Sequence, residues 1–287
     1  MKNTTKQMLA KSLAFIPDKL YLTVMYRIRM GKTINWKSPR TFNEKIQWLK
    51  VYDRKSEYTQ MADKYNAKEY VADIIGENHI IPTLGVWDKF DQIDFSTLPN
   101  QFVLKCTHDS GGLVVCRDKS QLDIEKSKKI LNASLKTNYY YYGREWPYKN
   151  IKPRIIAEKY MEQIDGTGLV DYKFYCFNGK PQYLYVSKNM DDHQIATVTF
   201  LDMNWNKLPV ERTDYKSAKE IPTCPSCFDE MRIIAERLSK GHKFLRVDLY
   251  QINGEVYFSE LTFHPASGFM GVIPPEYDKT MGQFLKI

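Results

Sequence analysis

Charged side chains of both signs are interleaved in one β-rich stretch near the end of the chain, residues 244–263. Apolar residues alternate there with Arg246 and Asp248, and Glu260 follows after an Asn253-Gly254 turn signal. This pattern predicts a β-hairpin with one apolar and one charged face. Two carboxylates and a guanidinium on neighbouring strands are costly to crowd together unless another ion lies between them. A magnesium ion with bound phosphate would satisfy both signs, because Mg²⁺ prefers hard oxygen ligands; a half-exposed hairpin with solvated charges is the alternative.

The length of the hairpin loop decides whether the two carboxylates meet. A two-residue turn at Asn253-Gly254 would pair Asp248 with Ser259 and turn Glu260 to the opposite face. A three-residue loop from Ile252, with Gly254 in the left-handed region, shifts the register by one residue. We predict this loop, because it places five side chains on one face: Arg246, Asp248, Phe258, Glu260 and Thr262. The apolar face beneath would hold Leu245, Val247, Leu249 and Leu261.

A second candidate site is the loop from Lys105 to Gly112, which joins two strand-like runs, residues 102–104 and 113–115. A loop with hydroxyls and paired glycines after a strand-end lysine can fold its backbone N–H groups over a phosphate. It is not a Walker loop, because the lysine precedes the glycines and no Gly-Lys-Ser/Thr follows. Taken alone, the pattern also fits a plain hairpin turn.

Helices and antiparallel strands must position these two stretches. Apolar periodicity predicts helices at residues 41–50, 121–136 and 228–238, and one that begins at Asp63 and ends at Gly76. Alternating patterns predict strands at residues 84–87, 155–161, 171–177, 182–187 and 196–201. Together they predict an α+β fold.

The composition is that of a globular protein. A chain of 287 residues with 43% hydrophobic residues suits one large or two smaller domains. Five cysteines without a framework spacing favour a reducing compartment, and the lone Cys224–Cys227 pair lacks the second ligand pair of a zinc site. No apolar run approaches the roughly 18 residues of a spanning helix. Asp18 and Lys19 interrupt the first apolar run, which argues against a secretory signal.

The basic charge is concentrated at the N-terminus. The net charge is +8, yet residues 1–50 alone hold eleven Lys or Arg against Asp18 and Glu44. Residues 5–30 have a helical pattern that Pro17 interrupts. Such a basic amphipathic stretch can lie on an anionic membrane or meet an acidic substrate, and a solvated helix face is the alternative. Nucleic-acid binding is disfavoured, because the rest of the chain is not basic and no nucleic-acid-binding motif is present.

In their order and spacing, these stretches resemble the ATP-grasp ligases, and most closely the TupA-like ATP-grasp group found with bacterial surface-polysaccharide synthesis. The resemblance runs from about Thr41 to the C-terminus. The motifs that carry it are Pro39 to Lys45, Ala62 to Tyr65, Val103 to Lys105 with the following loop, Ile156 to Lys159, Asp171 to Phe174, Arg246 to Tyr250, and Phe258 to Thr262.

The resemblance implies a role for each matched residue. Those that would bind ATP, through its phosphates, adenine or ribose, are Lys64, Lys105, Ser110, Gly111, Gly112, Glu158, Lys159, Tyr160, Met161 and Asp171. Those that would bind Mg²⁺ are Asp248, Glu260 and Thr262. Those that would act in catalysis are Arg246, which would stabilise an acyl phosphate, and Lys173, at a position where related ligases often have arginine.

Two departures from the family pattern concern the substrate and the metal. Many ATP-grasp enzymes have an α/β domain before the Asp-Lys helix, but only 62 residues precede Asp63 here. Thr262 stands where many relatives have asparagine as a third metal ligand. The chain shows no Ser-His-Asp or Cys-His order that argues for covalent catalysis.

These features predict an ATP-grasp fold, in which two α+β subdomains clasp ATP, with a helical basic N-terminal extension. The predicted parts are residues 1–62, the extension; 63–160, the first subdomain with the phosphate loop; and 161–287, the second subdomain with the metal-binding hairpin. We expect an ATP- and Mg²⁺-dependent carboxylate–amine ligase that acts on a uronic-acid-containing polysaccharide or its nucleotide- or lipid-linked precursor. The alternatives are a sugar transferase or kinase, and a non-catalytic membrane-surface module. The expected location is the cytoplasm, with residues 1–37 as a candidate contact to the inner face of the membrane.

Overall fold

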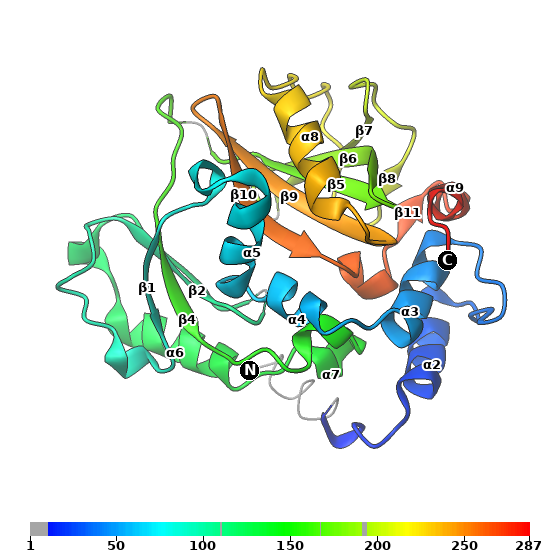
Figure 1. Cartoon of the computed structure of the whole chain (residues 1–287), viewed down its shortest axis with the longest axis horizontal. Coiled ribbons are helices and arrows are strands. Elements are labelled where there is room, and N and C mark those ends of the chain that lie inside the picture. The colour runs from blue at the N-terminus through cyan, green and yellow to red at the C-terminus, as the bar shows by residue number, and fades with distance from the viewer. Residues whose placement is uncertain (1–10, 110, 167, 191–193) are drawn as a thin grey trace. The chain divides into compact units, whose positions relative to one another are not determined.

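The computed structural model describes residues 11–109, 111–166, 168–190 and 194–287 (Figure 1). The contacts group the chain into two compact units. Within the described residues, unit 1 comprises the chain up to Pro17, Lys55–Tyr70 and Ile80–Met161. Unit 2 comprises Asp18–Arg54, Val71–His79 and Glu162–Ile287. One limit between the units falls inside helix α5 (Asn66–Ile75), which contributes to both.

Unit 1 is built on a four-stranded antiparallel sheet in the order β1-β4-β2-β3. Its strands are β1 (Thr83–Trp87), β2 (Phe102–Cys106), β3 (Leu113–Cys116) and β4 (Ile155–Lys159). Helix α6 (Ile124–Leu135) packs against β2 and β3, and Asp123 caps its start by accepting a hydrogen bond from the Lys126 amide. The shared core includes Phe102, Leu104 and Leu131. Two short helices, α4 (Glu57–Ala62) and α7 (Tyr140–Gly143), complete the unit.

Unit 2 is built on a five-stranded antiparallel sheet in the order β10-β9-β5-β6-β7. Its strands are β5 (Asp171–Phe177), β6 (Lys180–Lys188), β7 (Thr197–Asp202), β9 (Phe244–Ile252) and β10 (Glu255–Thr262). Helix α8 (Phe228–Ser239) crosses β5, β6 and β9 on one face of this sheet (Figure 1). A small ladder pairs β8 (Glu211–Arg212) with β11 (Val272–Ile273).

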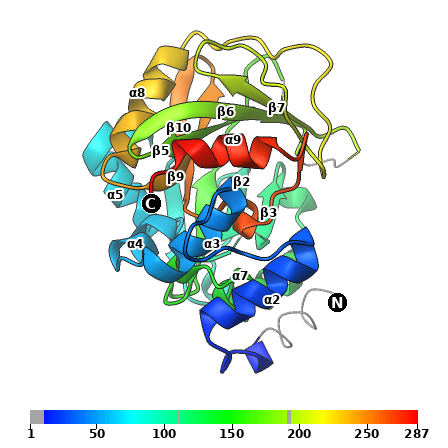
Figure 2. The same cartoon turned by 90° about the vertical axis from the view of Figure 1, so that its right-hand side faces the viewer.

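The other face of the five-stranded sheet is covered by α3 (Phe42–Tyr52) and α9 (Tyr277–Phe284), which pack against each other (Figure 2). Phe42 enters an aromatic core with Tyr175, Phe177 and Phe244, at ring-centroid distances of 5.2–5.9 Å. Such aromatic contacts bury large apolar areas and fix ring orientation. The sheet is therefore covered on both faces, which explains why β5 and β9 are buried almost throughout.

Local sequence signals explain where α3 begins and how it is held. Thr41 and Glu44 form a reciprocal capping box at its first turn. Lys45 donates from Nζ to the carbonyl oxygens of Gly282 and Leu285, at 2.9 and 2.6 Å. Part of the N-terminal basic charge is therefore structural, because it satisfies carbonyl groups at the end of α9.

Helix α2 (Asp18–Met30) precedes α3 and begins one residue after Pro17, as the sequence predicts. None of the helices in the described part of the chain is long and apolar enough to cross a membrane. The mixture of helices with antiparallel sheets confirms the predicted α+β class.

Candidate active site

The hairpin of β9 and β10 closes with a two-residue turn, so the predicted three-residue loop is wrong. Ile252 pairs directly with Glu255 across the turn. Asn253 and Gly254 both have left-handed backbone angles, with φ of 54° and 89°. This is the geometry of a type I′ turn, which matches the twist of the two strands and which Asn-Gly tolerates best. The prediction that Gly254 is left-handed is confirmed.

A β-bulge farther along β10 nevertheless brings Glu260 to the face of Asp248. Phe258 pairs with Leu249, Ser259 is left without a partner in the ladder, and Glu260 pairs with Asp248. The one-residue shift predicted for the loop thus occurs inside the strand. The prediction that Phe258 shares the charged face is wrong. Phe258 is buried and pairs with Leu249 on the apolar face.

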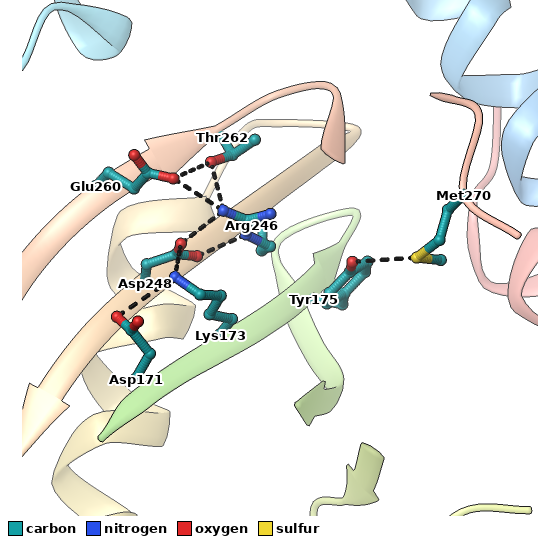
Figure 3. Close-up of polar contacts among 8 residues, drawn as sticks. All are labelled: Asp171, Lys173, Tyr175, Arg246, Asp248, Glu260, Thr262 and Met270. Atoms are coloured by element: carbon teal, nitrogen blue, oxygen red, sulfur yellow. Dashed lines mark hydrogen bonds and ion pairs between the residues drawn. The ribbon is translucent and has the colours of Figure 1, made fainter. Parts of the chain in front are cut away.

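Arg246 is at the centre of the charged face (Figure 3). Its Nε donates to Oδ1 of Asp248 at 2.7 Å, and its Nη2 donates to Oδ2 at 2.6 Å. The same Nη2 lies 2.9 Å from Oε1 of Glu260 and 3.0 Å from Oγ1 of Thr262. The hairpin residues predicted to share this face therefore form one hydrogen-bonded cluster, with the exception of Phe258.

Strand β5 adds a second cation to this cluster. Lys173 pairs with Asp248 across the two strands, and its Nζ lies 2.8 Å from Oδ2 of Asp248 and 3.3 Å from Oδ1 of Asp171. Burial alone would lower the pKa of Lys173, but Asp171 and Asp248 raise it well above its ordinary value. Burial likewise opposes the charge of Arg246, and Asp248 and Glu260 raise its pKa. Both cations are therefore charged at neutral pH.

Asp248 and Glu260 differ in their exposure. The Asp248 side chain is completely buried, and burial raises its pKa despite Arg246 and Lys173, which act in the opposite direction. The Glu260 side chain is 36% exposed. Glu260 is thus the carboxylate of this pair that solvent reaches.

The oxygen atoms of this cluster are of the type that binds magnesium. Asp248, Glu260 and Thr262 supply the hard oxygen atoms that Mg²⁺ takes. However, both oxygens of Asp248 already accept hydrogen bonds from cations, and the described residues contain no group of three or more His, Cys, Asp or Glu side chains arranged around a metal position. A metal ion at this site would therefore displace Arg246 or Lys173 from one Asp248 oxygen.

Unit 1 contains a second buried ionic cluster, which is centred on Glu158 of β4. Its Oε2 lies 2.7 Å from Nζ of Lys105, and its Oε1 forms an ion pair with Lys68. Burial would raise the pKa of Glu158, but Lys105 and Lys68 lower it below the ordinary value. Burial lowers the pKa of Lys68 in spite of Glu158. The predicted strand-end lysine and the predicted hinge glutamate are thus in direct contact.

Sequence reasoning missed Lys68. Its Nζ also donates to the Ile81 carbonyl at 2.6 Å and to Oγ1 of Thr83 at 3.1 Å, which joins α5 to the start of β1. The available signal was its position four residues after Lys64, about one helical turn along the segment that Asp63 opens. Asp63 caps this helix as predicted, because its Oδ1 accepts hydrogen bonds from the Tyr65 and Asn66 amides at 2.9 Å.

The predicted phosphate loop is anchored to helix α6. Ser134 of α6 donates a hydrogen bond to Oδ2 of Asp109, while the Gly112 amide donates to Oδ1 at 3.2 Å. A Cβ atom on Gly112 would lie 2.5 Å from Oγ of Ser134 and 2.8 Å from Cβ of Cys106, so any larger residue would force these neighbours to shift. Lys64 donates from Nζ to the Asp109 carbonyl. Lys64 and Gly112 therefore meet at one loop, and the predicted Ser110 lies outside the described residues.

The remaining predicted hinge residues follow Glu158 at the end of β4. Lys159 is exposed, and Tyr160 and Met161 are half-buried. The Tyr160 hydroxyl accepts a hydrogen bond from Nε of Arg117 at 3.2 Å. These three residues lie in unit 1, whereas the predicted ribose contact Asp171 lies in unit 2 beside Lys173. The adenine-binding role of this stretch stays a prediction.

The segment after β10 has unusual backbone geometry that sequence reasoning also missed. Ala266, Ser267 and Gly268 all have positive φ, between 48° and 64°. Buried Lys50 donates to the Ser267 carbonyl at 2.7 Å, and Gln47 donates to the Gly268 carbonyl at 2.7 Å. Left-handed conformations at non-glycine residues persist where surrounding contacts hold them, and they cluster at functional sites.

An antiparallel sheet with a glycine-bearing loop in unit 1, and an antiparallel sheet with an acidic and basic hairpin in unit 2, agree with the predicted ATP-grasp fold. The TupA-like ATPgrasp family model matches residues 44–286. The chain therefore belongs to the TupA-like ATP-grasp family, which confirms both the predicted family and the predicted fold.

Several solved structures are similar to this chain at low sequence identity. The D-alanine–D-alanine ligase from Helicobacter pylori is 14% identical, with 85% of this chain and 69% of that chain covered and a TM-score of 0.49. The D-alanine–D-alanine ligase from Bacillus anthracis complexed with ATP is 14% identical, with 71% and 53% covered and a TM-score of 0.42. The D-cycloserine synthetase DcsG is 16% identical, with 78% and 69% covered and a TM-score of 0.41. The chain thus spans about half of the Bacillus ligase. Among curated proteins, none matches the chain.

Proposed function

We propose that this protein is an ATP- and Mg²⁺-dependent carboxylate–amine ligase. Its proposed carboxylate is a uronic acid of a surface polysaccharide, or of the nucleotide- or lipid-linked precursor. The observation that carries the proposal is the contact of Arg246 with Asp248, Glu260 and Thr262 on one hairpin face, in a chain of the TupA-like ATP-grasp family. The polysaccharide part rests on the resemblance alone.

ATP supplies the γ-phosphoryl group that converts the carboxylate into an acyl phosphate, from which the amine displaces phosphate to give the amide. This chemistry requires positioning and positive charge more than a protein nucleophile. Arg246 is held rigidly through Nε and Nη2, and within the described residues no hydrogen bond uses its Nη1. Two N–H groups are therefore directed by the cluster yet available to an anionic group of the substrate.

The lysines of unit 1 suit the polyphosphate of a nucleotide. Lys105 is a quarter exposed and is oriented by Glu158, while Lys64 is fixed at the loop of Gly112. Preorganised cations of this kind stabilise phosphate charge without further rearrangement. Magnesium, when bound by Glu260 and Asp248, would neutralise further phosphate charge. The three carboxylates Asp171, Asp248 and Glu260 outnumber the two cations Lys173 and Arg246. The cluster therefore has a net negative charge, which favours binding of a divalent cation.

The proposal is tested by ADP release, measured with uronic acids and amino acids offered singly and in pairs. We expect release only when a carboxylate and an amine are both present. Release of UDP from a nucleotide sugar would instead identify a transferase, and failure to bind ATP would identify a non-catalytic module.

Nucleotide binding is tested separately with Lys105→Ala. Loss of this charge-assisted contact should weaken ATP binding by roughly 1.5–3 kcal/mol. Lys152→Ala is the matched control, because Lys152 lies in the same unit and its ion pair with Asp88 is on the surface. Equal ATP affinity in both variants would show that Lys105 does not contribute to ATP binding.

We further propose that helix α2 lies on an anionic membrane surface. Tyr21, Leu22 and Tyr26 bury one side of this helix, yet Leu20, Val24 and Ile28 are 57%, 50% and 70% exposed. Their spacing of four residues makes one apolar stripe. Arg27, Arg29 and Lys32 are exposed near its end. An apolar stripe beside basic residues is typical of helices that lie in the membrane interface.

A further inference from the structure

A groove on unit 1 is lined by lysines that do not belong to the candidate active site. Its volume is about 710 Å³, and one face of α6 forms much of its lining. Lys129, Asn132 and Lys136 follow one another along this face at helical spacing. Lys11 and Tyr141, from other segments of unit 1, also line the groove.

The charges in this groove are unbalanced. Among the described residues, its lining contains Lys11, Lys128, Lys129 and Lys136 and one acidic residue, Glu125. Lys128 is neutralised by Asp91, at 2.6 Å. Within the part of the chain that the structure describes, no ion pair involves Lys129 or Lys136. Lys129 and Lys136 lie two helical turns apart on this face, so an extended anionic ligand would contact both.

The other lining groups suit a sugar better than a lipid surface. Asn132 and Thr137 offer an amide and a hydroxyl, and Tyr141 offers a half-buried ring. Among the described residues, Ala133 is the one aliphatic member of the lining. Concave sites of this kind use a few polar groups and an aromatic surface to orient a ligand.

The groove lies on the same helix that holds the phosphate loop. Ser134, which donates to Asp109, lies between the lining residues Ala133 and Lys136. Thr137 donates from Oγ1 to the Ser134 carbonyl at 2.7 Å, and Nε2 of His108 lies 3.2 Å from the same oxygen. A ligand in the groove would therefore contact the turn of α6 to which the loop is anchored.

We propose that this groove binds an acidic polysaccharide, with Lys129 and Lys136 on the uronate carboxylates and Tyr141 against a sugar ring. The identity of the polymer rests on the proposed function, because a ligase acting on a uronic acid must hold the neighbouring, equally anionic sugars. Binding itself requires neither ATP nor turnover.

The test is titration calorimetry of the full chain with polygalacturonate, at low and at moderate salt. We expect Lys129→Ala/Lys136→Ala to lose at least tenfold in affinity, and Tyr141→Leu to lose affinity without any change in charge. The control is Lys126→Ala/Lys180→Ala, which removes the same charge from exposed positions outside the groove and should change affinity less than twofold.

Neutral dextran and phosphatidylglycerol vesicles serve as further probes. We expect no dextran binding, and vesicle binding that the groove variant leaves unchanged. Equal losses of polygalacturonate affinity in the groove and control variants would show a diffuse charge effect and overturn the proposal. Parallel loss of vesicle binding in the groove variant would overturn it in favour of a lipid ligand. Polygalacturonate binding by a chain that releases no ADP would separate this inference from the proposed ligase activity.

Discussion

At the scale of single residues, the two carboxylates of the hairpin require different experiments. Asp248 is buried between Arg246 and Lys173, so Asp248→Asn would leave two buried cations with one fewer counter-charge. Breaking a buried ion pair from one side costs about 3–5 kcal/mol. Glu260 is partly exposed, and its removal leaves the contacts between Arg246 and Asp248 in place.

We therefore predict that Glu260→Gln abolishes Mg²⁺-dependent turnover and keeps the fold, whereas Asp248→Asn also lowers the free energy of unfolding. Urea denaturation and ADP release measured on the same samples separate the two effects. Glu255→Gln, at an exposed position of the same strand, is the control. Full Mg²⁺-dependent activity in Glu260→Gln would exclude this carboxylate as a metal ligand.

The pair of lysines on Glu158 makes a prediction about pH. Because Lys105 and Lys68 lower the pKa of Glu158, the unfolded chain binds this proton at a higher pH than the folded chain. The stabilisation is thus complete above the unfolded value of about 4.3 and is lost as the pH falls through the lower folded pKa.

We expect Glu158→Gln to reduce the acid dependence of the unfolding free energy and to lower stability at neutral pH by about 3 kcal/mol. Denaturant unfolding between about pH 3 and pH 7 measures both effects. Glu162→Gln, at an exposed position four residues on, should behave as the unmodified protein. If the unfolding free energy of Glu158→Gln depends on acid pH as that of the unmodified protein does, the ion pairs of Glu158 do not contribute to stability.

At the scale of elements, the β-bulge at Ser259 decides which face carries Glu260. Ser259 is the residue of β10 without a partner in the ladder, between the pairs of Phe258 and Glu260. Deleting it would make the ladder regular and still leave Glu260 opposite Asp248. Deleting Leu261 instead would move Thr262 into a buried apolar position.

We therefore predict that the Ser259 deletion retains Mg²⁺-dependent ADP release, while the Leu261 deletion loses it together with thermal stability. Circular dichroism melting and activity on both variants test this. Loss of activity in a well-folded Ser259 deletion would mean that the bulge itself, and not the register alone, shapes the site.

At the scale of the whole molecule, the exposed stripe of α2 predicts membrane attachment. Each basic group near an anionic leaflet contributes about 1 kcal/mol and is screened by salt, and the apolar stripe adds to this. Replacing Leu20, Val24 and Ile28 by Gln should abolish flotation with phosphatidylglycerol vesicles at low salt. Because all three are exposed, the fold should be unaffected.

The chain offers a matched control for this experiment. Ile195, Ile221 and Ile233 are similarly exposed, at 57%, 51% and 55%, but they form no common stripe. Their replacement by Gln should leave flotation unchanged. If both triple variants float as well as the unmodified protein, α2 does not contact the membrane through this stripe.

Much of the fold could be predicted from short-range pattern. The helix that starts after Thr41, the cap of Asp63, the Asn253-Gly254 turn signal and the strand alternation each depend on residues a few positions apart. Local backbone preference and side-chain periodicity are properties of such neighbours, so most helices and strands could be predicted from the sequence, although α4 and α9 were missed. The order of the motifs along the chain also determined the family.

The tertiary structure alone decided where the register shift of the hairpin lies and which charged residues from distant segments meet. The Asn-Gly turn keeps its preferred two-residue form, and burial of Val247 and Leu261 on one face then requires the extra residue to be absorbed at Ser259. The contacts of Lys68 with Glu158 and of Lys173 with Asp248 join segments 75 or more residues apart. No local pattern encodes such contacts, because they depend on strand register and burial, which the whole sheet sets.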